Sequence, residues 1–133
     1  MSSAITFRIP GTIDRKLTPN GSGHHMATYR LSRALKKRVT KALEAAKVSE
    51  QVPATATGLH LDFVVAWEKG RRFMDDDNIK ASLKYGIDSI AEHVGINDRN
   101  FILGEVIQTR DVDKTGYIGV VIVPTYNELE SAA

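Results

Sequence analysis

The sequence predicts a single α+β domain in which two helices pack on a small mixed β-sheet. Apolar residues recur every second residue in some segments and every third or fourth residue in others, and these segments follow one another in the order β-α-β-α-β-β. The chain has 133 residues, of which 42% are hydrophobic, which suits one core better than two marginal ones. We therefore expect one domain over residues 1–133, with a frayed tail at 127–133.

The N-terminal half is predicted to form a strand, a turn and a long helix. Residues 5–9 alternate apolar and polar side chains and stop at Pro10 and Gly11. Residues 17–23 have the composition of a turn, and residues 26–48 have helical periodicity. The apolar stripe of this helix is Leu31, Leu35, Val39, Leu43 and Ala46.

The middle of the chain is predicted to form a buried strand and a second helix. After a connector at 49–57, residues 59–67 form a strand that becomes buried on both faces, with Phe63 and Trp67 in the core. The helix is expected to begin near Asp77 and Asn78, which are both good N-cap residues. Its apolar stripe is Ile79, Leu83, Ile87, Ile90 and Val94.

The C-terminal part is predicted to add two strands to the sheet. Gly95 stands where a left-handed residue ends a helix. Strands are expected at residues 101–110 and 117–124, with a turn at 113–116 between them.

Composition excludes several classes of protein. The chain has no cysteine, so disulfide scaffolds, thiolate zinc sites and cysteine nucleophiles are excluded, and a reducing compartment is expected. The N-terminus lacks the pattern of a secretory signal, and no apolar run approaches the ~20 residues that a membrane helix needs. We expect a soluble intracellular protein.

The net charge of +2 is divided unevenly along the chain. From Asp75 to Glu105 there are three bases against seven acids, a net of −4, and the remainder has fifteen bases against nine acids, a net of +6. An acidic centre in a basic surround suits a metal-dependent enzyme that acts on a polyanion. Solvated helix faces can produce the same distribution without any such function.

The most unusual segment is the run of three acids at 75–77, directly before the second predicted helix. In an extended approach to the helix, Asp75 and Asp77 point the same way. Helical spacing then places Lys84 and Asp88 on the same side as Asp77, and Asp98 follows the helix. Converging carboxylates repel one another unless a cation lies between them, and all-oxygen ligation favours Mg²⁺ or Mn²⁺.

Simpler explanations exist for the same residues. An acidic helix start is more often a cap than a metal site, although a cap needs only one carboxylate. Lys84 and Asp88 have the spacing of an ordinary surface ion pair.

Basic residues follow one face of the first predicted helix and fill the loop before the acids. Arg30, Arg33, Lys37 and Lys41 share a helical face, and Arg71 and Arg72 precede the acidic run. Both groups suit contacts to phosphates, and both could equally be solvated surface. The adjacent His24 and His25 read as a pair at the helix entry rather than as metal ligands, with His25 as a candidate DNA contact.

Three motifs together resemble the signature of the RusA-like Holliday junction resolvases, a family of crossover junction endodeoxyribonucleases common in phages and prophages. The motifs are Asp75-x-Asp77-Asn78, Lys84-x-x-x-Asp88, and Gly95-Ile96-Asn97-Asp98 followed by Phe101-Ile102. More loosely, Leu17-Thr18-Pro19-Asn20 and His25 resemble the N-terminal segment of the family. The resemblance covers roughly residues 5–124 in element order.

The resemblance implies a homodimeric, Mg²⁺-dependent endonuclease that resolves four-way DNA junctions by paired symmetric nicks, in the cytoplasm of a bacterial or phage-infected cell. Mn²⁺ is expected to substitute for Mg²⁺. Carried over to this sequence, the metal-binding carboxylates are Asp75, Asp77 and Asp98, and Lys84 is the catalytic lysine. Asp88 would orient Lys84 or join the metal site.

Two departures from the family pattern leave alternatives open. The gap between Asn78 and Lys84 is long, so Lys80 is a rival for the lysine role and a further candidate DNA contact, as is Asn20. Asn97 stands where a second acid is expected. Two other functions also remain: a noncatalytic nucleic-acid-binding module of the same fold, and a nuclease that prefers flaps or forks.

Overall fold

A computed structural model describes residues 4–14, 17, 25–111 and 115–126. The expected α+β class and the order of the main elements are confirmed. The strands are β1 (Ile5–Pro10), β2 (Gly58–Glu68), β3 (Phe101–Asp111) and β4 (Tyr117–Thr125), and the helices are α1 (His25–Ala45), α2 (Val48–Gln51) and α3 (Asp76–Val94), with a short 3₁₀ helix η2 (Asp98–Asn100). The predicted turn at 17–23, apart from Leu17, and the predicted tail at 127–133 lie outside the described residues.

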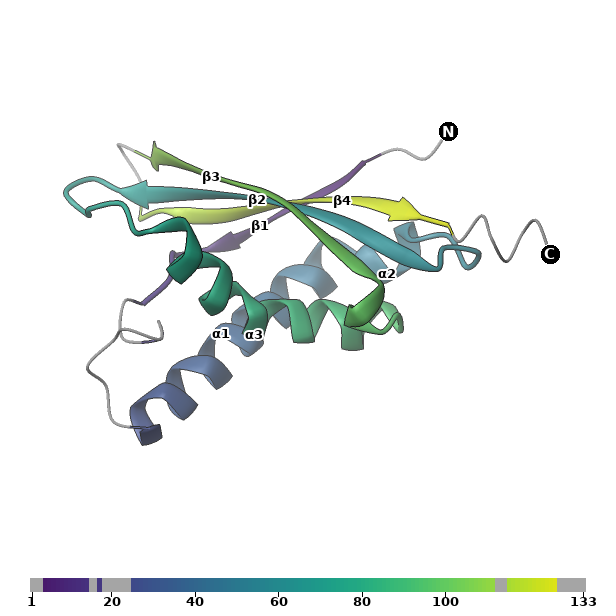
Figure 1. Ribbon diagram of the computed structural model, residues 1–133, viewed down its shortest axis with the longest axis horizontal. Coiled ribbons are helices and arrows are strands. Elements are labelled where there is room, and N and C mark those ends of the chain that lie inside the picture. Colours follow the sequence, from purple (N-terminus) through teal and green to yellow (C-terminus); the bar gives the residue numbers. More distant parts are fainter. Residues whose placement is uncertain (1–3, 15–16, 18–24, 112–114, 127–133) are drawn as a thin grey trace.

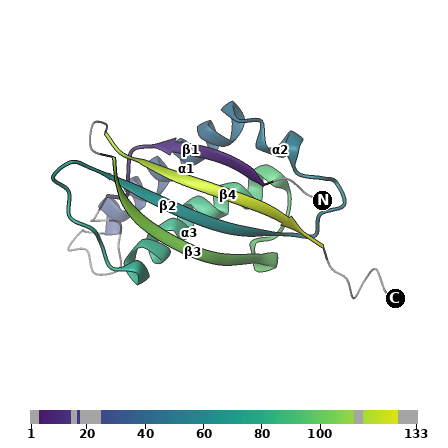
Figure 2. The same cartoon turned by 90° about the horizontal axis from the view of Figure 1, so that it is seen from above.

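The four strands form one mixed sheet in the order β1-β4-β2-β3 (Figures 1 and 2). β4 runs antiparallel to both of its neighbours, whereas β2 and β3 are parallel. Helix α3 connects β2 to β3, as a parallel pair requires a crossover. The two strands therefore start at the same end of the sheet, where Leu59 pairs with Phe101, and they finish together at the other end.

Helices α1 and α3 lie side by side on one face of the sheet (Figure 1). The core fills the space between them and the sheet, and it includes Phe63 and Trp67, as expected. The predicted stripes are buried in both helices, except that Leu31, Ala46 and Val94 are only partly buried. No helix or strand covers the opposite face in the described part of the chain (Figures 1 and 2).

The first helix ends earlier than its periodicity predicts. A single helix was expected up to residue 48, but α1 ends at Ala45 and Lys47 adopts a left-handed conformation with φ 53°. The chain then enters the four-residue helix α2, inside the segment expected to be a connector. Val48 is fully buried, which explains why the apolar pattern continues past the real end of α1.

The second long helix begins earlier than expected. Asp75 is its N-cap, and the amide of Ile79 donates to the Asp75 carbonyl to close the first turn. Asp77, predicted near the cap, is already the second helical residue. At the other end, Gly95 has φ 75° and donates its amide to the Ala91 carbonyl, so the predicted left-handed stop is confirmed.

None of the helices in the described part of the chain has the length and hydropathy that a membrane crossing requires.

Candidate carboxylate site at the start of helix α3

The three acids at 75–77 are exposed at the N-terminal end of α3. Asp75 caps the helix by its backbone only, because its side chain makes no capping hydrogen bond. Among the described residues, no hydrogen bond or ion pair engages the carboxylates of Asp75 and Asp77. Both carboxylates are therefore available to an external ligand, beside the positive end of the helix dipole.

The relation between these acids differs from the one expected. The extended approach predicted for 75–77 would place Asp75 and Asp77 on one side and Asp76 on the other. Because the helix begins at Asp76, only Asp75 is extended, with φ −62° and ψ 138°. The alternation of a strand therefore does not apply to the pair, although both residues stay in the first turn.

Asp76 is tied to the sheet through Gln108 of β3. The side-chain oxygen of Gln108 accepts from the indole nitrogen of Trp67 at 2.8 Å and from the amide of Met74 at 2.9 Å. Its side-chain nitrogen donates to the Met74 carbonyl at 2.6 Å and to Asp76 Oδ1 at 3.1 Å. One glutamine thus fixes the chain on both sides of Asp75.

Gln108 was not among the residues that the sequence singled out. Its only signal is a polar residue at a position of β3 that pairs with the buried Val65, on the face that the helices cover. Its partners lie 32 to 41 residues away, in β2, in the loop before α3 and at the start of α3, and periodicity along β3 does not reveal them.

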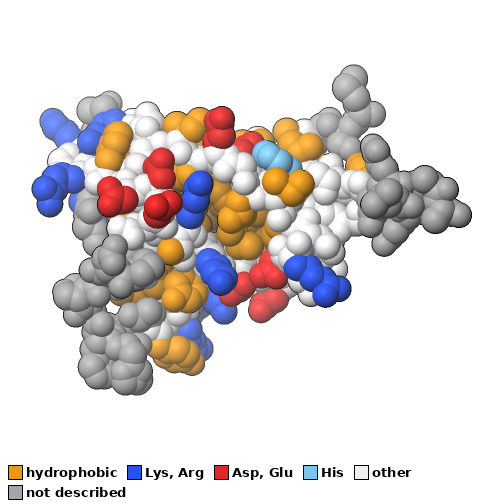
Figure 3. Space-filling model, in the orientation of Figure 1, with side chains coloured by type: hydrophobic (Ala, Val, Ile, Leu, Met, Phe, Trp, Pro, Cys, Tyr) orange, Lys and Arg blue, Asp and Glu red, His pale blue; other side chains and the backbone are white. Residues whose placement is uncertain are grey.

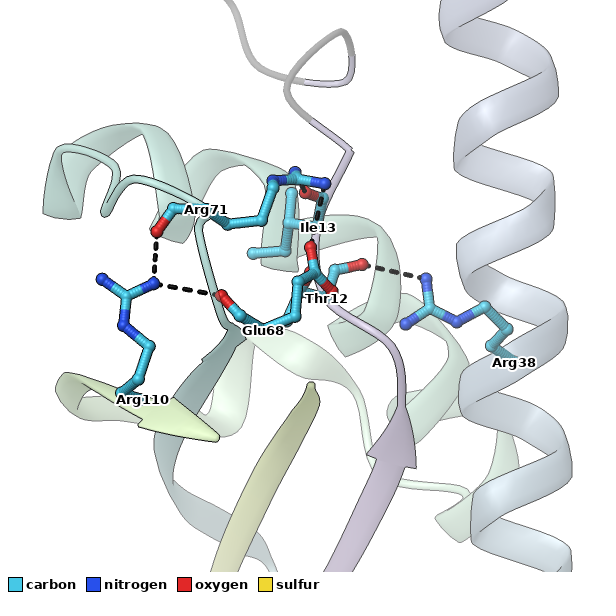
Figure 4. Close-up of polar contacts among 6 residues, drawn as sticks. All are labelled: Thr12, Ile13, Arg38, Glu68, Arg71 and Arg110. Carbon is cyan, nitrogen blue, oxygen red and sulfur yellow. Dashed lines mark hydrogen bonds and ion pairs between the residues drawn. The ribbon is translucent and has the colours of Figure 1, made fainter. Parts of the chain in front are cut away.

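The loop before α3 is held by arginines that bind backbone carbonyls (Figure 4). Arg110 donates to the carbonyls of Glu68 and Arg71. Arg71 donates to the carbonyl of Ile13 at 3.4 Å and forms an ion pair with the Glu68 carboxylate at 3.0 Å. The charge of Arg71, a candidate phosphate contact, is therefore partly compensated. Arg72 is exposed beside it.

The lysines proposed for catalysis project from α3 into solvent. Lys80 lies one turn after Asp76 and Asp77, and Lys84 lies a further turn along; both are exposed. Asp88 approaches Lys36 of α1, with Nζ and Oδ2 4.0 Å apart, and not Lys84. The helix therefore places Lys80 nearer to the acids than Lys84.

Asp98 lies at the opposite end of α3 from Asp75 and Asp77. The 19 residues of α3 span roughly 28 Å at a rise of ~1.5 Å per residue, and Asp98 opens η2 beyond that end. There it lines a hollow of about 430 Å³ together with Lys36 and Asp88. Within the described residues, no three acidic or histidine side chains are close enough to hold a metal ion together. The structure thus keeps Asp75 and Asp77 in one turn and places Asp98 elsewhere.

The basic face predicted on α1 is exposed as expected. Arg30, Arg33, Lys37 and Lys41 are all exposed, and the first turns of α1 and α3 lie toward the same end of the molecule (Figures 1 and 2). Acidic side chains gather over the start of α3 at the left of Figure 3, with Lys and Arg side chains beside them. Asn20 and the side chain of His25 lie outside the described part of the structure.

Arg38, on the same helix, is partly buried and binds backbone carbonyls. It donates to the carbonyl of Pro10 at 3.0 and 2.6 Å and to that of Thr12 at 3.1 Å (Figure 4 shows the contact to Thr12). Burial lowers the pKa of the Arg38 guanidinium from its ordinary value, but it stays charged near neutral pH. Arg38 therefore fastens the end of β1 to α1.

Comparison with known proteins leaves the family undecided. No family model matches the sequence, and no curated protein matches it. Among solved structures, the chain is similar to one titled "Crystal Structure of Hydrogenase Maturation Protein HypE in complex with ATP", with 16% identity and a TM-score of 0.31. The match covers 96% of this chain and 31% of that chain. A TM-score this low supports no statement about shared fold or function.

Proposed function

We propose that the protein is a Mg²⁺-dependent endonuclease that hydrolyses phosphodiester bonds in branched DNA and acts as a homodimer on four-way junctions. The observation that carries this proposal is the pair of exposed, unengaged carboxylates at Asp75 and Asp77, which coincide with the first of the three motifs described above. The preferred substrate follows from the resemblance to the RusA-like resolvases.

The carboxylate pair suits a hard divalent cation. Mg²⁺ in phosphoryl-transfer sites is commonly bound by one or two carboxylates together with waters and phosphate oxygens of the substrate. Asp75 and Asp77 supply two carboxylates at one helix turn, and no thiolate or imidazole competes there among the described residues. A site completed by the DNA itself does not need a third protein ligand from the same turn.

The residues around the pair would divide the remaining work. Bound Mg²⁺ would lower the pKa of a water and neutralise charge at the scissile phosphate. Lys80 or Lys84 would offset charge on the phosphate as it is attacked, and Arg72 would contact a neighbouring phosphate. The basic face of α1 would hold the DNA backbone without reading bases.

The position of Asp98 favours one competing function. The resemblance requires Asp98 in the same metal site as Asp75 and Asp77, but the three do not meet within the chain. A noncatalytic nucleic-acid-binding module would need no such convergence, and its acids would serve only at the helix start. One cleavage assay distinguishes the proposed resolvase from this noncatalytic module and from a nuclease that prefers flaps or forks.

The test uses a synthetic four-way junction with Mg²⁺ and compares the wild type with Asp77→Asn. We expect symmetric nicks by the wild type and a loss of cleavage of at least ~100-fold in the variant, with binding retained. Glu50→Gln is the matched control, because Glu50 is an exposed acid on α2 to which the proposal gives no role, so this variant should cleave at a rate near that of the wild type. Binding without Mg²⁺-dependent cleavage by the wild type would establish the noncatalytic module, and faster cleavage of flaps or forks would change the substrate.

A further inference from the structure

We infer that Phe73, in the loop between β2 and α3, is a stacking site for a DNA base whose face is uncovered at the branch point. The inference rests on the proposed function and deepens it, because it assigns the preference for branched over linear DNA to one side chain. It is carried by the exposure of Phe73, by the cation held against its ring, and by its nearness to Asp75.

Phe73 differs from the other aromatic residues near the site in its exposure. Phe63 and Trp67 belong to the core, at 4% and 0% exposed, so neither can meet a base. Phe73 is 47% exposed, although the next residue, Met74, is buried. A single exposed apolar side chain is ordinary on a protein surface, so the surroundings of the ring decide what it can do.

A fixed cation supports the ring of Phe73 from one side. The guanidinium of Arg110 lies over the ring, 4.8 Å from its centre. The same guanidinium donates to the carbonyls of Glu68 and Arg71, so the loop backbone sets its position (Figure 4). A ring held in this way loses little conformational freedom when a base stacks on it, and such preorganisation favours binding. The exposed part of the ring is the part that Arg110 does not cover.

The loop around Phe73 is basic. Lys69 and Arg72 are exposed on either side of it in the sequence. Exposed cations beside an exposed aromatic ring are typical of sites for unpaired nucleic acid, where the cations contact phosphates and the ring stacks on a base of any sequence. A protein partner could also contact a phenylalanine beside an arginine. The two exposed cations and the nearby acids of the proposed cleavage site favour DNA.

Phe73 lies close to the carboxylates proposed for catalysis. It precedes Asp75 by two residues, so the two Cα atoms are at most ~7.6 Å apart. Gln108 binds the amide and the carbonyl of Met74, which stands between them, and so fixes the backbone that joins the ring to the acid. Bases follow one another at ~3.4 Å along a DNA strand. A base on Phe73 therefore belongs to a nucleotide within a few steps of the phosphate that is cut.

Stacking on Phe73 would distinguish branched from linear DNA. In a linear duplex each base is stacked between its neighbours, so a contact with the ring requires a base to be unstacked at a cost in free energy. A branch point, a flap or a single strand already leaves the face of a base uncovered. The ring next to the acids would therefore favour complexes in which the branch point lies at the site of cleavage.

The first experiment locates the base by photo-crosslinking. A synthetic four-way junction carries 5-iodouracil in place of thymine at the branch point and is irradiated with the full-length wild type in metal-free buffer, so that no strand is cut. Mass spectrometry identifies the linked residue, and we expect Phe73. The same label in the middle of a linear duplex should give no link to Phe73. A link to Tyr29 or Tyr126, the other two exposed aromatic residues, in place of Phe73 would overturn the inference.

The second experiment compares dissociation constants for the junction and for a linear duplex of equal length. Phe73→Leu should raise the constant about 5- to 50-fold for the junction and less than ~2-fold for the duplex, because only the junction offers a base to stack. Phe73→Trp keeps an aromatic ring and should stay within about 3-fold of the wild type on both.

Tyr126→Leu is the matched control for loss of an exposed aromatic ring. Tyr126 is 42% exposed and follows β4, whose last residue pairs with the start of β2, whereas Phe73 follows the end of β2. This variant should bind both DNAs within about 2-fold of the wild type.

The outcomes separate this inference from the proposed function. Equal weakening of both DNAs by Phe73→Leu, or a Phe73→Trp variant as weak as Phe73→Leu, would overturn the inference and leave Phe73 to a protein partner or to the structure of the loop. A wild type that crosslinks through Phe73 but cuts no branched DNA with Mg²⁺ would overturn the proposed function alone. A wild type that cuts junctions without any link to Phe73 would overturn this inference alone, and a wild type that binds no DNA would overturn both.

Discussion

At the scale of single residues, the acids that would do chemistry are held by residues that do none. Gln108 uses both ends of its amide to hold the loop before α3, and Arg110 holds the same loop through two backbone carbonyls. Asp75 and Asp77 contribute nothing to this frame, so their carboxylates stay available. A carboxylate that must bind a cation is best left out of the hydrogen bonds that fix the loop.

Gln108→Leu is expected to lower the free energy of unfolding by about 2–4 kcal/mol. The substitution keeps the volume but removes the hydrogen bonds of Gln108 to the indole nitrogen of Trp67 and to both backbone groups of Met74. Each of these groups that water does not reach in the variant costs ~1–3 kcal/mol, and we expect one or two of them to stay dry. Urea denaturation measures the change. Thr109→Val, at the adjacent exposed position, serves as the control and should change the free energy by less than ~0.5 kcal/mol. Equal stability of the two variants would show that the glutamine is not an anchor.

Arg38→Met is expected to lower the free energy of unfolding by about 1–3 kcal/mol, because the carbonyls of Pro10 and Thr12 lose a charged donor. Lys37→Met removes one positive charge from the adjacent exposed position and should cost less than ~0.5 kcal/mol. Comparing the free energies of unfolding of the two variants, from thermal or urea denaturation, distinguishes the effect of the lost hydrogen bonds from that of the lost charge. A similar cost for both variants would mean that charge alone matters.

At the scale of elements, helix α3 determines which acids can act together. Asp75 and Asp77 share its first turn, and Asp98 follows its last one. Because β2 and β3 are parallel, the chain must travel the length of the sheet between them, and the helix covers that distance in one run. Within one chain, the topology therefore separates the third acid from the other two.

Asp77→Asn and Asp98→Asn are expected to differ in their response to Mg²⁺. Millimolar Mg²⁺ should raise the melting temperature of the wild type by ~1–3 °C, because binding to the folded state stabilises it. The rise should be absent in Asp77→Asn and present in Asp98→Asn, since Asp98 lies at the other end of α3. Differential scanning fluorimetry with Mg²⁺ titrated against each variant measures this. Loss of the rise in both variants would indicate that Asp98 joins the site from a second subunit.

The sequence predicts the elements well because periodicity is a local property. The stripes of α1 and α3 and the stop at Gly95 each depend on residues within a few turns, and they are confirmed. The ends of the helices are predicted less well. The end of α1 depends on the left-handed backbone of Lys47, and the start of α3 depends on a cap that Asp75 makes through its backbone alone. The separation of Asp98 from Asp75 and Asp77 could not be predicted, because it depends on the parallel pairing of β2 and β3, which no local pattern encodes.

At the scale of the whole molecule, basic and acidic side chains gather near one end of the helical layer. The basic face of α1 and the acids of α3 begin toward the same end of the helical layer (Figure 1). The net charge of +2 does not reveal this arrangement, because the −4 of residues 75–105 cancels most of the +6 of the remaining chain.

Replacing Arg30, Arg33, Lys37 and Lys41 with glutamine is expected to weaken junction binding and to lower its dependence on salt. Removing one phosphate-binding cation should reduce the slope of log K against log salt by ~0.9, so the fourfold variant should have a slope smaller by up to about 3–4. Binding measured between about 50 and 200 mM salt, which spans the range where counterion release dominates, gives the slope. Replacing the exposed Arg99, beyond the far end of α3, should leave the slope unchanged. An unchanged slope in the fourfold variant would place the DNA elsewhere.

The position of β4 between β1 and β2 has a consequence for how the chain folds. Among the strands of the described residues, β1 pairs with β4 alone, from Ile5 with Ile122 to Pro10 with Tyr117. During synthesis the first strand made must wait for the last one, so the sheet cannot be completed until β4 has left the ribosome. Pairing across more than a hundred residues also slows closure, since the entropy of a large loop is lost before its contacts form. We expect nascent chains that end before residue 117 to leave β1 unpaired and open to chaperones and proteases.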